Sequence, residues 1–291
     1  MSRVALVTAT AARHLDEDLP PLCRALGDAH LEHDIVVWDD RSVDWASFDL
    51  VVLRSAWDYA ERRDAFVAWA RAVPRLANPP EVIAWNTDKR YLRDLARDGV
   101  AVTPTTWIEP GDSITLPDGD IVVKPAVSAG ARHTARYLPD AHAHAREHVR
   151  GLQRRGRTTM VQPYLSRIDE HGETALLFFG GVFSHAVRKG PILVPGAAVV
   201  EGLFAKEDIS PREPTEAERA LAERTLDSVP GGRDALLYAR VDVAPGIDGA
   251  PLVLELELTE PSVFLAHAPG AAGRFARAIG ARVATSTQRP R

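Results

Sequence analysis

Three acidic side chains and one arginine share a face of a predicted hairpin near the C-terminus. In the second strand of this hairpin, alternation places Glu255 and Glu257 on one face and the leucines on the other. These leucines are Leu252, Leu254, Leu256 and Leu258. In the first strand, Arg240 and Asp242 alternate in the same way, and a symmetric register places Arg240 opposite Glu255 and Asp242 opposite Val253. The hairpin therefore gathers an acidic patch that contains a single cation.

Three neighbouring carboxylates repel one another unless a positive charge lies among them. Mg²⁺ prefers hard oxygen ligands and usually takes one or two carboxylates, completing its shell with phosphate and water. A solvated amphipathic strand, in which glutamates balance arginines, would leave the same pattern in the sequence. The hairpin alone leaves both interpretations open.

Two lysines favour the interpretation with magnesium and phosphate. Only four of the 35 basic residues are lysines, so a lysine in this arginine-rich chain is a candidate for a lysine-specific role. Lys124 ends a predicted buried strand and is followed by the small-residue loop 126–134, whose backbone N–H groups could approach phosphates. Lys89 lies upstream, near the start of a predicted helix.

Other motifs for nucleotide or nucleophile chemistry are missing. The sequence has no Gly-Lys-Ser/Thr loop, no G-x-G-x-x-G turn after a strand and no G-x-S-x-G elbow. The segment His144-Ala-Arg-Glu147-His148 matches the inverted zinc-protease pattern H-x-x-E-H. Arg146 and Arg150 crowd the same segment, which favours a polar surface helix, and a zinc hydrolase remains a distant alternative.

Composition narrows the class of protein. The 291 residues carry a net charge of −5 with both signs mixed, which argues against a nucleic-acid or membrane-binding surface. There is no signal-peptide core and no apolar run of membrane-spanning length. The single cysteine, Cys23, cannot form an internal disulfide, which fits a reducing compartment. We expect a cytoplasmic enzyme that acts on a small molecule, and homo-oligomerisation remains open.

The elements that must position these residues follow two patterns of secondary structure. Residues 1–85 alternate strands and helices, which predicts a parallel sheet with its ligand site at the carboxyl ends of the strands. The predicted strands are 4–7, 35–38 and 50–53, and the helices are 19–26 and 65–73. Later residues predict helices at 87–97, 141–152, 216–226 and 273–283, and strands at 121–124 and 159–163. Antiparallel hairpins are predicted at 174–188 and 236–259.

In this order along the chain, the motifs resemble the ATP-grasp superfamily of carboxylate–amine ligases. They are Lys89, the Lys124-Pro125 strand end, the strand 160–164 and the Asp242…Glu255-x-Glu257 hairpin. Segments 54–59, 85–89, 183–189 and 254–262 resemble the O-ureido-D-serine cyclo-ligase branch, which closes the ring in D-cycloserine biosynthesis. The resemblance implies an α/β fold with an α+β C-terminal part. Its expected segments are a Rossmann-like pre-ATP-grasp substrate domain (1–85), a central subdomain with the lid and phosphate loop (86–165) and a C-terminal subdomain with the magnesium site (166–291).

The resemblance also implies a nucleotide site with metal ions. Lys89 and Lys124 would contact the phosphates of ATP. The phosphate loop would contribute Ser128 and Gly130, and the hinge beside the adenine would contribute Gln162, Tyr164 and Leu165. Asp242, Glu255 and Glu257 would hold Mg²⁺, two ions being expected, with Mn²⁺ as a substitute. Many relatives carry Asn at the third metal position, where this chain has Glu257.

Residues expected near the substrate come from both halves of the chain. The resemblance places Arg240 against the γ-phosphate and the substrate carboxylate. Lys189 shares a strand face with His185, and a cation there could reach the acylphosphate. Arg54, Trp57, Asp58 and His185 are expected to bind the substrate. Trp57 could instead pack under the following helix, and His185 and Lys189 could be solvated charges on one strand face. Lys206 fits either a surface or a ribose-side position.

The activity implied is ATP-dependent activation of a small amino-acid carboxylate as an acylphosphate, followed by closure of an intramolecular amide. Two alternatives remain open: an intermolecular, peptide-type ligase with a separate amine, and an ATP-binding regulator without catalysis.

Overall fold

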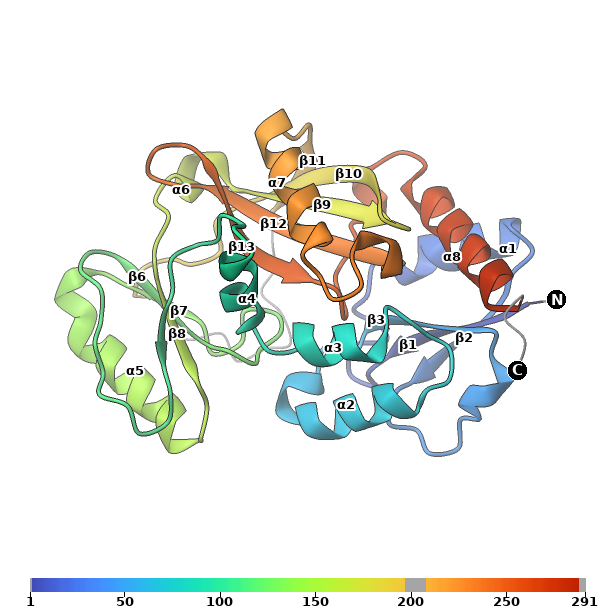
Figure 1. Cartoon of the computed structure of the whole chain (residues 1–291), viewed down its shortest axis with the longest axis horizontal. Coiled ribbons are helices and arrows are strands. Elements are labelled where there is room, and N and C mark those ends of the chain that lie inside the picture. Colours follow the sequence, from blue (N-terminus) through green and yellow to red (C-terminus); the bar gives the residue numbers. More distant parts are fainter. Residues whose placement is uncertain (1, 197–207, 288–291) are drawn as a thin grey trace.

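Three β-sheets follow one another along the chain, and helices cover them (Figure 1). The computed structural model describes residues 2–196 and 208–287. No described helix has the length and hydropathy required to cross a membrane. The three sheets fall within the three segments expected from the sequence, and the exact domain limits stay a prediction.

The first sheet is parallel, as the alternating pattern predicts. Its strands have the order β2-β1-β3-β4 and all pair in parallel. The strands are β1 (Arg3–Thr8), β2 (Glu32–Val37), β3 (Leu50–Ser55) and β4 (Leu76–Ala77). The helices of this segment are α1 (Leu19–Asp28), α2 (Arg63–Ala72) and α3 (Pro80–Asn86). Because β3 is buried along its whole length, it lies in the centre of this unit.

The second sheet is a small antiparallel unit with the order β5-β8-β6-β7, on the left of Figure 1. Its strands are β5 (Thr106–Ile108), β6 (Ile121–Pro125), β7 (Ala135–Tyr137) and β8 (Thr159–Pro163). Helix α5 (His142–Arg154) packs against it through Ala145, Val149 and Leu152. The three-residue edge strands β5 and β7 leave little periodicity in the sequence and were not predicted.

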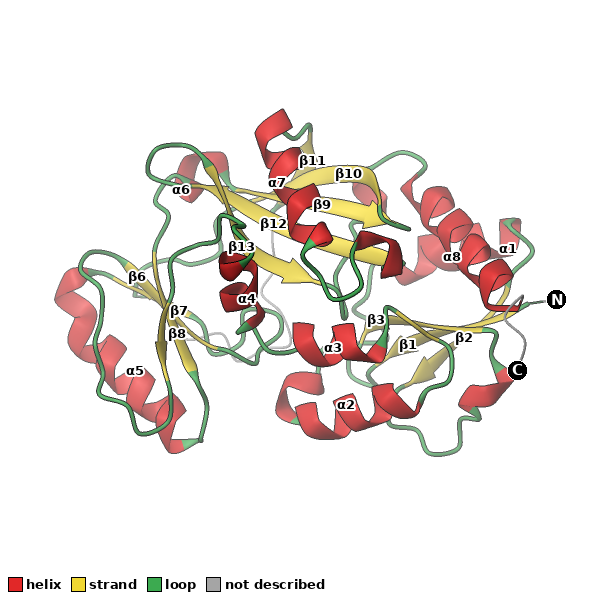
Figure 2. Cartoon of the chain, viewed as in Figure 1, coloured by secondary structure: helices red, strands yellow, loops and turns green. Residues whose placement is uncertain are grey.

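The third sheet is antiparallel with the order β11-β10-β9-β12-β13. Its strands are β9 (Glu173–Phe179), β10 (Val182–Lys189), β11 (Ile209–Arg212), β12 (Tyr238–Pro245) and β13 (Pro251–Glu257). Helix α6 (Ile168–His171) precedes it, α7 (Glu216–Asp227) covers one face, and α8 (Ala271–Thr287) packs on β9 and β10 and against α1 (Figure 2). The C-terminal helix therefore joins the third sheet to the first unit.

Alternation along β12 separates the core from the site. Val241 and Val243 pack in the core under α7, whereas Arg240 and Asp242 point to the opposite face. Helix α7 begins at a capping box: Thr215 and Glu218 each accept a hydrogen bond from the other's backbone N–H.

The predicted helix over residues 87–97 is wrong at its start. The structure has α3 (Pro80–Asn86), a turn, and then α4 (Tyr91–Arg97). The turn is held from outside, because the Lys89 N–H donates to Ala126 O at 2.8 Å. The Asn86 side chain likewise bonds the backbone of Leu256 and Leu258. Tertiary hydrogen bonds therefore interrupt the helix.

Candidate active site

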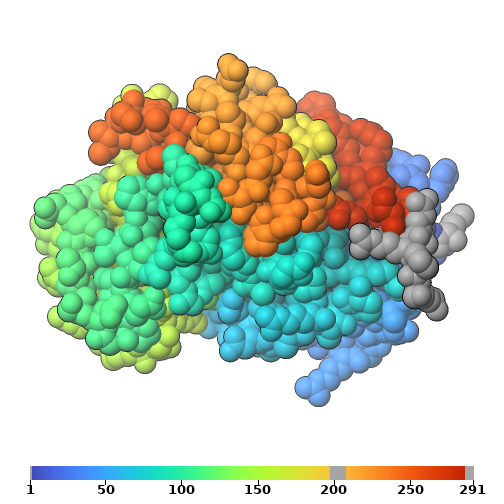
Figure 3. All heavy atoms as spheres, in the orientation of Figure 1, coloured from blue at the N-terminus to red at the C-terminus, as the bar shows by residue number. Residues whose placement is uncertain are grey.

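A cavity of about 550 Å³ is lined by residues from all three units. Figure 3, coloured by residue number, shows the three units next to one another on one face of the molecule. Most of the expected site residues line the cavity: Trp57, Lys89, Lys124, Ser128, Gly130, Gln162, Tyr164, Leu165, Lys189, Arg240, Glu255 and Glu257. Four expected residues are absent from the lining, namely Arg54, Asp58, His185 and Asp242. Lys206 lies outside the described residues.

The acidic hairpin forms with its charged residues on one face, as predicted, but the predicted register is wrong. Arg240 lies opposite Glu257 and Asp242 opposite Glu255, and the register shifts directly after Asp242. Because this irregularity interrupts the alternation, Val253 faces the core while Leu254 reaches the cavity. The expectation that all four leucines share the core face is therefore also wrong.

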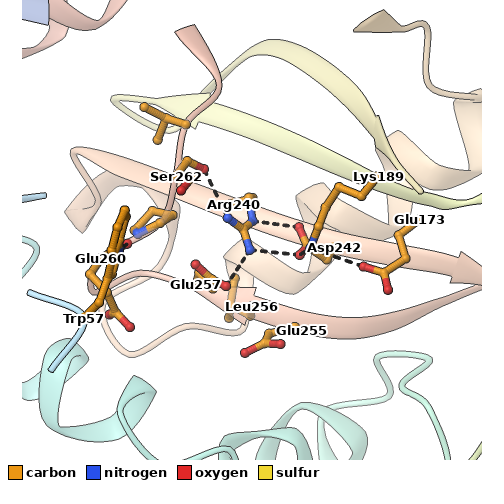
Figure 4. Close-up of polar contacts among 12 residues, drawn as sticks. Trp57, Glu173, Lys189, Arg240, Asp242, Glu255, Leu256, Glu257, Glu260 and Ser262 are labelled. Atoms are coloured by element: carbon orange, nitrogen blue, oxygen red, sulfur yellow. Dashed lines mark hydrogen bonds and ion pairs between the residues drawn. The ribbon is translucent and has the colours of Figure 1, made fainter. Parts of the chain in front are cut away.

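Ion pairs run across this face from β12 to β10 and β9 (Figure 4). Arg240 Nε donates to Asp242 Oδ1 at 2.9 Å, and Arg240 Nη2 also pairs with Glu257. Lys189 Nζ lies 2.9 Å from Asp242 Oδ2 and 3.3 Å from Glu173 Oε2. Asp242 is 1% exposed, so its two cationic partners compensate a charge that is buried.

Glu173 is a site residue that sequence reasoning missed. It lies opposite Lys189 in the β9–β10 hairpin and lines the cavity. Extending the predicted hairpin by one residue at its open end would have found it.

Lys89 and Lys124 lie on the other side of Glu255. Lys89 Nζ lies 3.0 Å from Glu255 Oε1 and donates to Ser128 O at 2.7 Å. Burial on its own raises the pKa of the Glu255 carboxyl, but the ammonium groups of Lys89 and Lys124 lower it to about 2. Burial lowers the pKa of Lys124, and the negative charge of Glu255 opposes that effect. Glu255 is therefore held as a carboxylate between two lysines.

The pKa values of Glu257 and Glu260 shift in the opposite direction to that of Glu255. Burial raises the pKa of Glu257 to about 7, with Arg240 lowering it and the nearby charge of Glu255 raising it further. Burial, and then the charge of Glu257, raise the pKa of Glu260 well above its ordinary value. The cavity thus holds more acidic groups than its own cations can keep ionised, which is expected of a site that receives a further cation.

The loop after Lys124 is tightly wound. Gly130, Ala131 and His133 have φ of 61°, 60° and 56°, in the left-handed region that non-glycine residues rarely adopt. Ser128 turns inward, where both its carbonyl and its hydroxyl accept from Lys89. Glu61 of the first unit pairs with Arg132 of this loop, so the loop contacts the first unit.

The predicted hinge strand lies at another wall of the cavity. Gln162 is buried and its Nε2 donates to Thr105 Oγ1 at 2.9 Å. The guanidinium of Arg136 lies 3.4 Å from the centre of the Tyr164 ring, and the Tyr164 hydroxyl donates to Asp169. A flat aromatic–guanidinium surface next to buried Leu165 is suited to pack against a planar ring.

The donors of the acidic cluster suit a magnesium ion that is shared with phosphate. Carboxylate oxygens are hard ligands, and Asp242, Glu255 and Glu257 approach one face of the sheet. In the described part of the chain, however, no group of three His, Cys, Asp or Glu side chains is arranged to hold a metal by itself. Lysine and arginine groups occupy these carboxylates, so the protein alone is an incomplete metal site.

The zinc interpretation of His144, Glu147 and His148 is not supported by the geometry of that helix. Glu147 pairs with Arg150 and Arg154, and His148 hydrogen-bonds the Tyr137 hydroxyl. The absence of a three-ligand group among the described residues applies to this helix as well.

Three of the expected substrate residues hold the loop 259–265, which follows β13. Trp57 Nε1 donates to Glu260 O at 3.1 Å, Arg54 Nη2 to Pro261 O at 2.9 Å and His185 Nε2 to Val263 O at 2.9 Å. The fourth expected residue, Asp58, accepts from Trp38 Nε1 and pairs with Arg62 at the rim of the first unit.

Arg240, Tyr238 and Asp18 complete this network. Arg240 Nη1 donates to Ser262 O at 3.1 Å, and Tyr238 OH donates to Thr259 O at 2.9 Å. Asp18 accepts from the backbone N–H groups of residues 263, 264 and 265. Every residue of the loop from 259 to 265 is thus fixed by at least one side chain. Asp18 was not singled out from the sequence, because nothing local connects it to a loop so distant in the chain.

Sequence comparison connects the chain to cycloserine biosynthesis. Residues 4–78 match the family "D-cycloserine synthetase DcsG, N-terminal domain". Cycloserine biosynthesis protein DcsG of Streptomyces lavendulae is 38% identical over 300 residues, which cover 97% of this chain and 99% of that protein.

Structural comparison gives the same relative and a wider fold group. The crystal structure of D-cycloserine synthetase DcsG matches with a TM-score of 0.88 at 38% identity, over 97% of this chain and all of the other. D-alanine–D-alanine ligase from Bacillus anthracis, solved with ATP, matches with a TM-score of 0.67 at 12% identity, over 99% of this chain and 98% of that one. The ATP-grasp ligase PsnB, solved with Mg and ADP, matches with a TM-score of 0.61 at 18% identity, over 97% of this chain and 99% of that one. These two distant matches show the shared fold.

Proposed function

Because the chain belongs to the D-cycloserine synthetase family of ATP-grasp ligases, we propose that it closes O-ureido-D-serine into D-cycloserine at the expense of ATP. The observation that carries this proposal is that Lys89, Lys124 and the acidic pair Glu255 and Glu257 line one cavity. This is the combination of charges that phosphoryl transfer to a carboxylate requires.

ATP would lie between the second and third sheets. Lys89 and Lys124 would contact its phosphates, together with Ser128 and Gly130 of the loop after Lys124. The adenine would pack near Gln162, Tyr164 and Leu165, where the cavity wall is buried and partly apolar. Lys89 and Lys124 come from the second unit, whereas Glu255 and Glu257 come from β13 of the third, so a nucleotide bound with its metal would bridge the two units.

Asp242, Glu255 and Glu257 would hold Mg²⁺, and we expect two ions, which Mn²⁺ could replace. When bound, the metal supplies positive charge that offsets the charge developing on the transferred phosphoryl group. Lys189 and Arg240 now compensate Asp242, and Arg240 and Lys89 compensate the two glutamates. These cations would turn to phosphate and substrate oxygens as metal takes their place.

The reaction balances without any further oxidant or reductant. A carboxylate oxygen of the substrate attacks the γ-phosphorus, forming an acylphosphate as the bond to ADP breaks. The nitrogen bonded to the side-chain oxygen then attacks the acyl carbon, phosphate leaves, and the isoxazolidinone ring closes with loss of the N–H proton. Water removes the carbamoyl group as CO₂ and ammonia.

Arg240 and Lys189 are the residues that we assign to the reacting carboxylate. Both line the cavity, and both pair with Asp242, from where they could turn to the substrate carboxylate once metal binds Asp242. Arg240 also donates to Ser262 O, which fixes its guanidinium plane. Its role would be to orient the carboxylate toward the phosphate and to neutralise the acylphosphate.

The test is an assay of phosphate release and product formation with O-ureido-D-serine and Mg-ATP, with and without an added amine. The proposal predicts phosphate and D-cycloserine in equal amounts without the amine. Release that requires a separate amine would indicate a peptide-type ligase. Absence of release across a panel of small carboxylates would favour a nucleotide-binding regulator. We also propose a cytoplasmic location, which the lone cysteine favours.

A further inference from the structure

Glu260 faces the cavity, and within the described part of the chain no cation pairs directly with its carboxyl group. It is 7% exposed and lines the cavity. It forms no ion pair with the described residues, whereas Glu255 and Glu257 pair with Lys89 and Arg240 respectively. Removing a carboxylate from water without a partner is costly, which is why such groups in native proteins normally meet a cation.

Residues of the first unit hold the backbone of Glu260 at the cavity. Its backbone carbonyl accepts from Trp57 Nε1 at 3.1 Å, and the hydroxyl of buried Tyr59 lies near its carboxyl group. Trp57 lies directly beside Glu260, and Glu257 separates Glu260 from Asp242 (Figure 4). The neighbouring residues Pro261 and Ser262 are fixed by Arg54 and Arg240. A side chain whose backbone is fixed in this way can recognise a ligand group with little further ordering.

We propose that Glu260 binds the α-ammonium group of the amino-acid substrate and makes that group a requirement for turnover. This inference rests on the proposed function. ATP brings only negative charge, and the acids nearer the lysines are assigned to its metal. The substrate's ammonium is therefore the cation left to compensate Glu260, and its N–H donors suit a carboxylate.

The other acids near this end of the cavity are less suited to the role. Asp18 already accepts three backbone N–H bonds, so its oxygens are committed to the loop. Glu17 also lines the cavity, but its side chain is exposed and water can solvate it. A buried, oriented carboxylate discriminates far better for or against a charged group than an exposed one does.

Pairing with Glu260 would also direct the chemistry. An amine that is held as an ammonium ion has no lone pair and cannot attack an acylphosphate. The less basic nitrogen of the ureido-oxy group is then the nucleophile, and it lies in the same molecule. Glu260 would therefore favour ring closure over formation of a dipeptide.

The experiment compares O-ureido-D-serine with 3-(ureidooxy)propanoate, which lacks the amine, in the wild type and in Glu260→Gln and Glu17→Gln. We expect Glu260→Gln to raise KM for the amino substrate by roughly 10-fold to 100-fold, the usual effect of removing one partner of a buried charge pair. KM for ATP and kcat/KM for the desamino compound should change little. The preference for the amine should therefore collapse in Glu260→Gln and persist in Glu17→Gln.

Two results would overturn the inference: an equal loss with both compounds in Glu260→Gln, or a selective loss in Glu17→Gln. If Glu260→Gln does not fold, Glu260→Asp takes its place, since its shorter side chain keeps the charge but holds it further from the ligand. An unchanged preference in Glu260→Asp would also overturn the inference, and an intermediate preference would support it. A wild type without phosphate release on O-ureido-D-serine would instead contradict the proposed function.

Discussion

The ammonium of Lys89 lies 3.0 Å from the carboxylate of Glu255, so a group assigned to phosphate and a group assigned to metal neutralise each other. The same relationship recurs between Lys189 and Asp242 at 2.9 Å. In these two pairs, charges assigned to phosphate and substrate compensate charges assigned to metal. Binding of ATP and of metal must then break the same ion pairs, which couples the two events.

The first prediction concerns that coupling. Mg²⁺ alone should bind weakly, because its carboxylates are already paired with Lys89, Lys189 and Arg240. With a non-hydrolysable ATP analogue present, the lysines can turn to phosphates and the metal should bind at least about tenfold more tightly. Calorimetric titration with and without the analogue measures this. Equal affinity in both titrations would show that the site is not coupled.

The second prediction concerns the two lysines at the phosphates. Lys89 and Lys124 are 7% and 8% exposed, and the wider planar guanidinium cannot occupy the position of a compact ammonium. Lys89→Arg and Lys124→Arg should each lower kcat/KM for ATP by about 100-fold, the loss seen when one charge-stabilising donor is removed. Arg150→Lys, at an exposed position of helix α5, serves as the matched control and should retain activity. Active Arg variants would mean that only charge matters there.

The third prediction concerns Glu255. Glu255→Gln removes the carboxylate that Lys89 and Lys124 hold ionised, so it should lower turnover by about 100-fold or more. It also leaves two ammonium groups without their shared anion, and the free energy of unfolding should fall by about 3 kcal/mol. Glu147→Gln, at an exposed helical position, controls for the isosteric change. Unaltered activity in Glu255→Gln would contradict the catalytic assignment of the cluster.

The fourth prediction concerns Arg54, which is 1% exposed and lies beneath the loop 259–265. Arg54→Met should reduce the free energy of unfolding by about 3 kcal/mol, because Asp18 and the carbonyl of Pro261 lose a buried cation. Denaturant unfolding beside Arg71→Met, on the exposed part of α2, measures the difference. If Arg54→Met unfolds like wild type but fails to bind substrate, direct substrate contact would be the better account.

The fifth prediction concerns pH. Burial lowers the pKa of His185 to about 4, opposed by the hydrogen bond to Val263 O, while the charge of Arg274 adds to the lowering. In the unfolded chain this histidine takes up its proton near pH 6.5, whereas the folded chain resists protonation down to about 4. The stability is therefore complete above about pH 6.5 and decreases as pH falls toward 4.

His185→Gln keeps an N–H donor for Val263 and removes the titration. Its free energy of unfolding should depend less on pH between about 6.5 and 4 than that of wild type, by at most about 1.4 kcal/mol per pH unit. Chemical denaturation at a series of pH values provides the comparison. Parallel curves would show that His185 does not titrate abnormally. His148, whose pKa burial also lowers to about 4, should remain as a second contribution in the variant.

Local patterns in the sequence predicted most elements that carry the site. Lys124 at a strand end, the loop after it and the acidic hairpin are short-range features, and the structure places them around one cavity. The hairpin register could not be predicted, because the irregularity after Asp242 depends on packing rather than on alternation. The turn before α4 was missed for a related reason, since Lys89 and Asn86 are held by distant backbone groups.

The residues that hold the loop 259–265 show a different limit of prediction from sequence. Arg54 and Trp57 lie at the carboxyl end of β3, the position where parallel sheets present ligand-binding groups. Their partners are 207 and 203 residues further along the chain. Sequence position predicts where such side chains are presented, but not which distant segment will occupy that place. Glu260 lies on that segment, so its position in the cavity follows from the structure and could not be predicted from the sequence motif.

The central claim is that ATP activates the substrate's carboxylate in this cavity, and an isotope experiment tests it most directly. O-ureido-D-serine with ¹⁸O in both carboxylate oxygens is incubated with the enzyme and unlabelled Mg-ATP in unlabelled water. Because the acyl C–O bond breaks when the ring closes, each inorganic phosphate should carry one ¹⁸O atom. Formation of D-cycloserine with phosphate that contains no ¹⁸O would contradict the account.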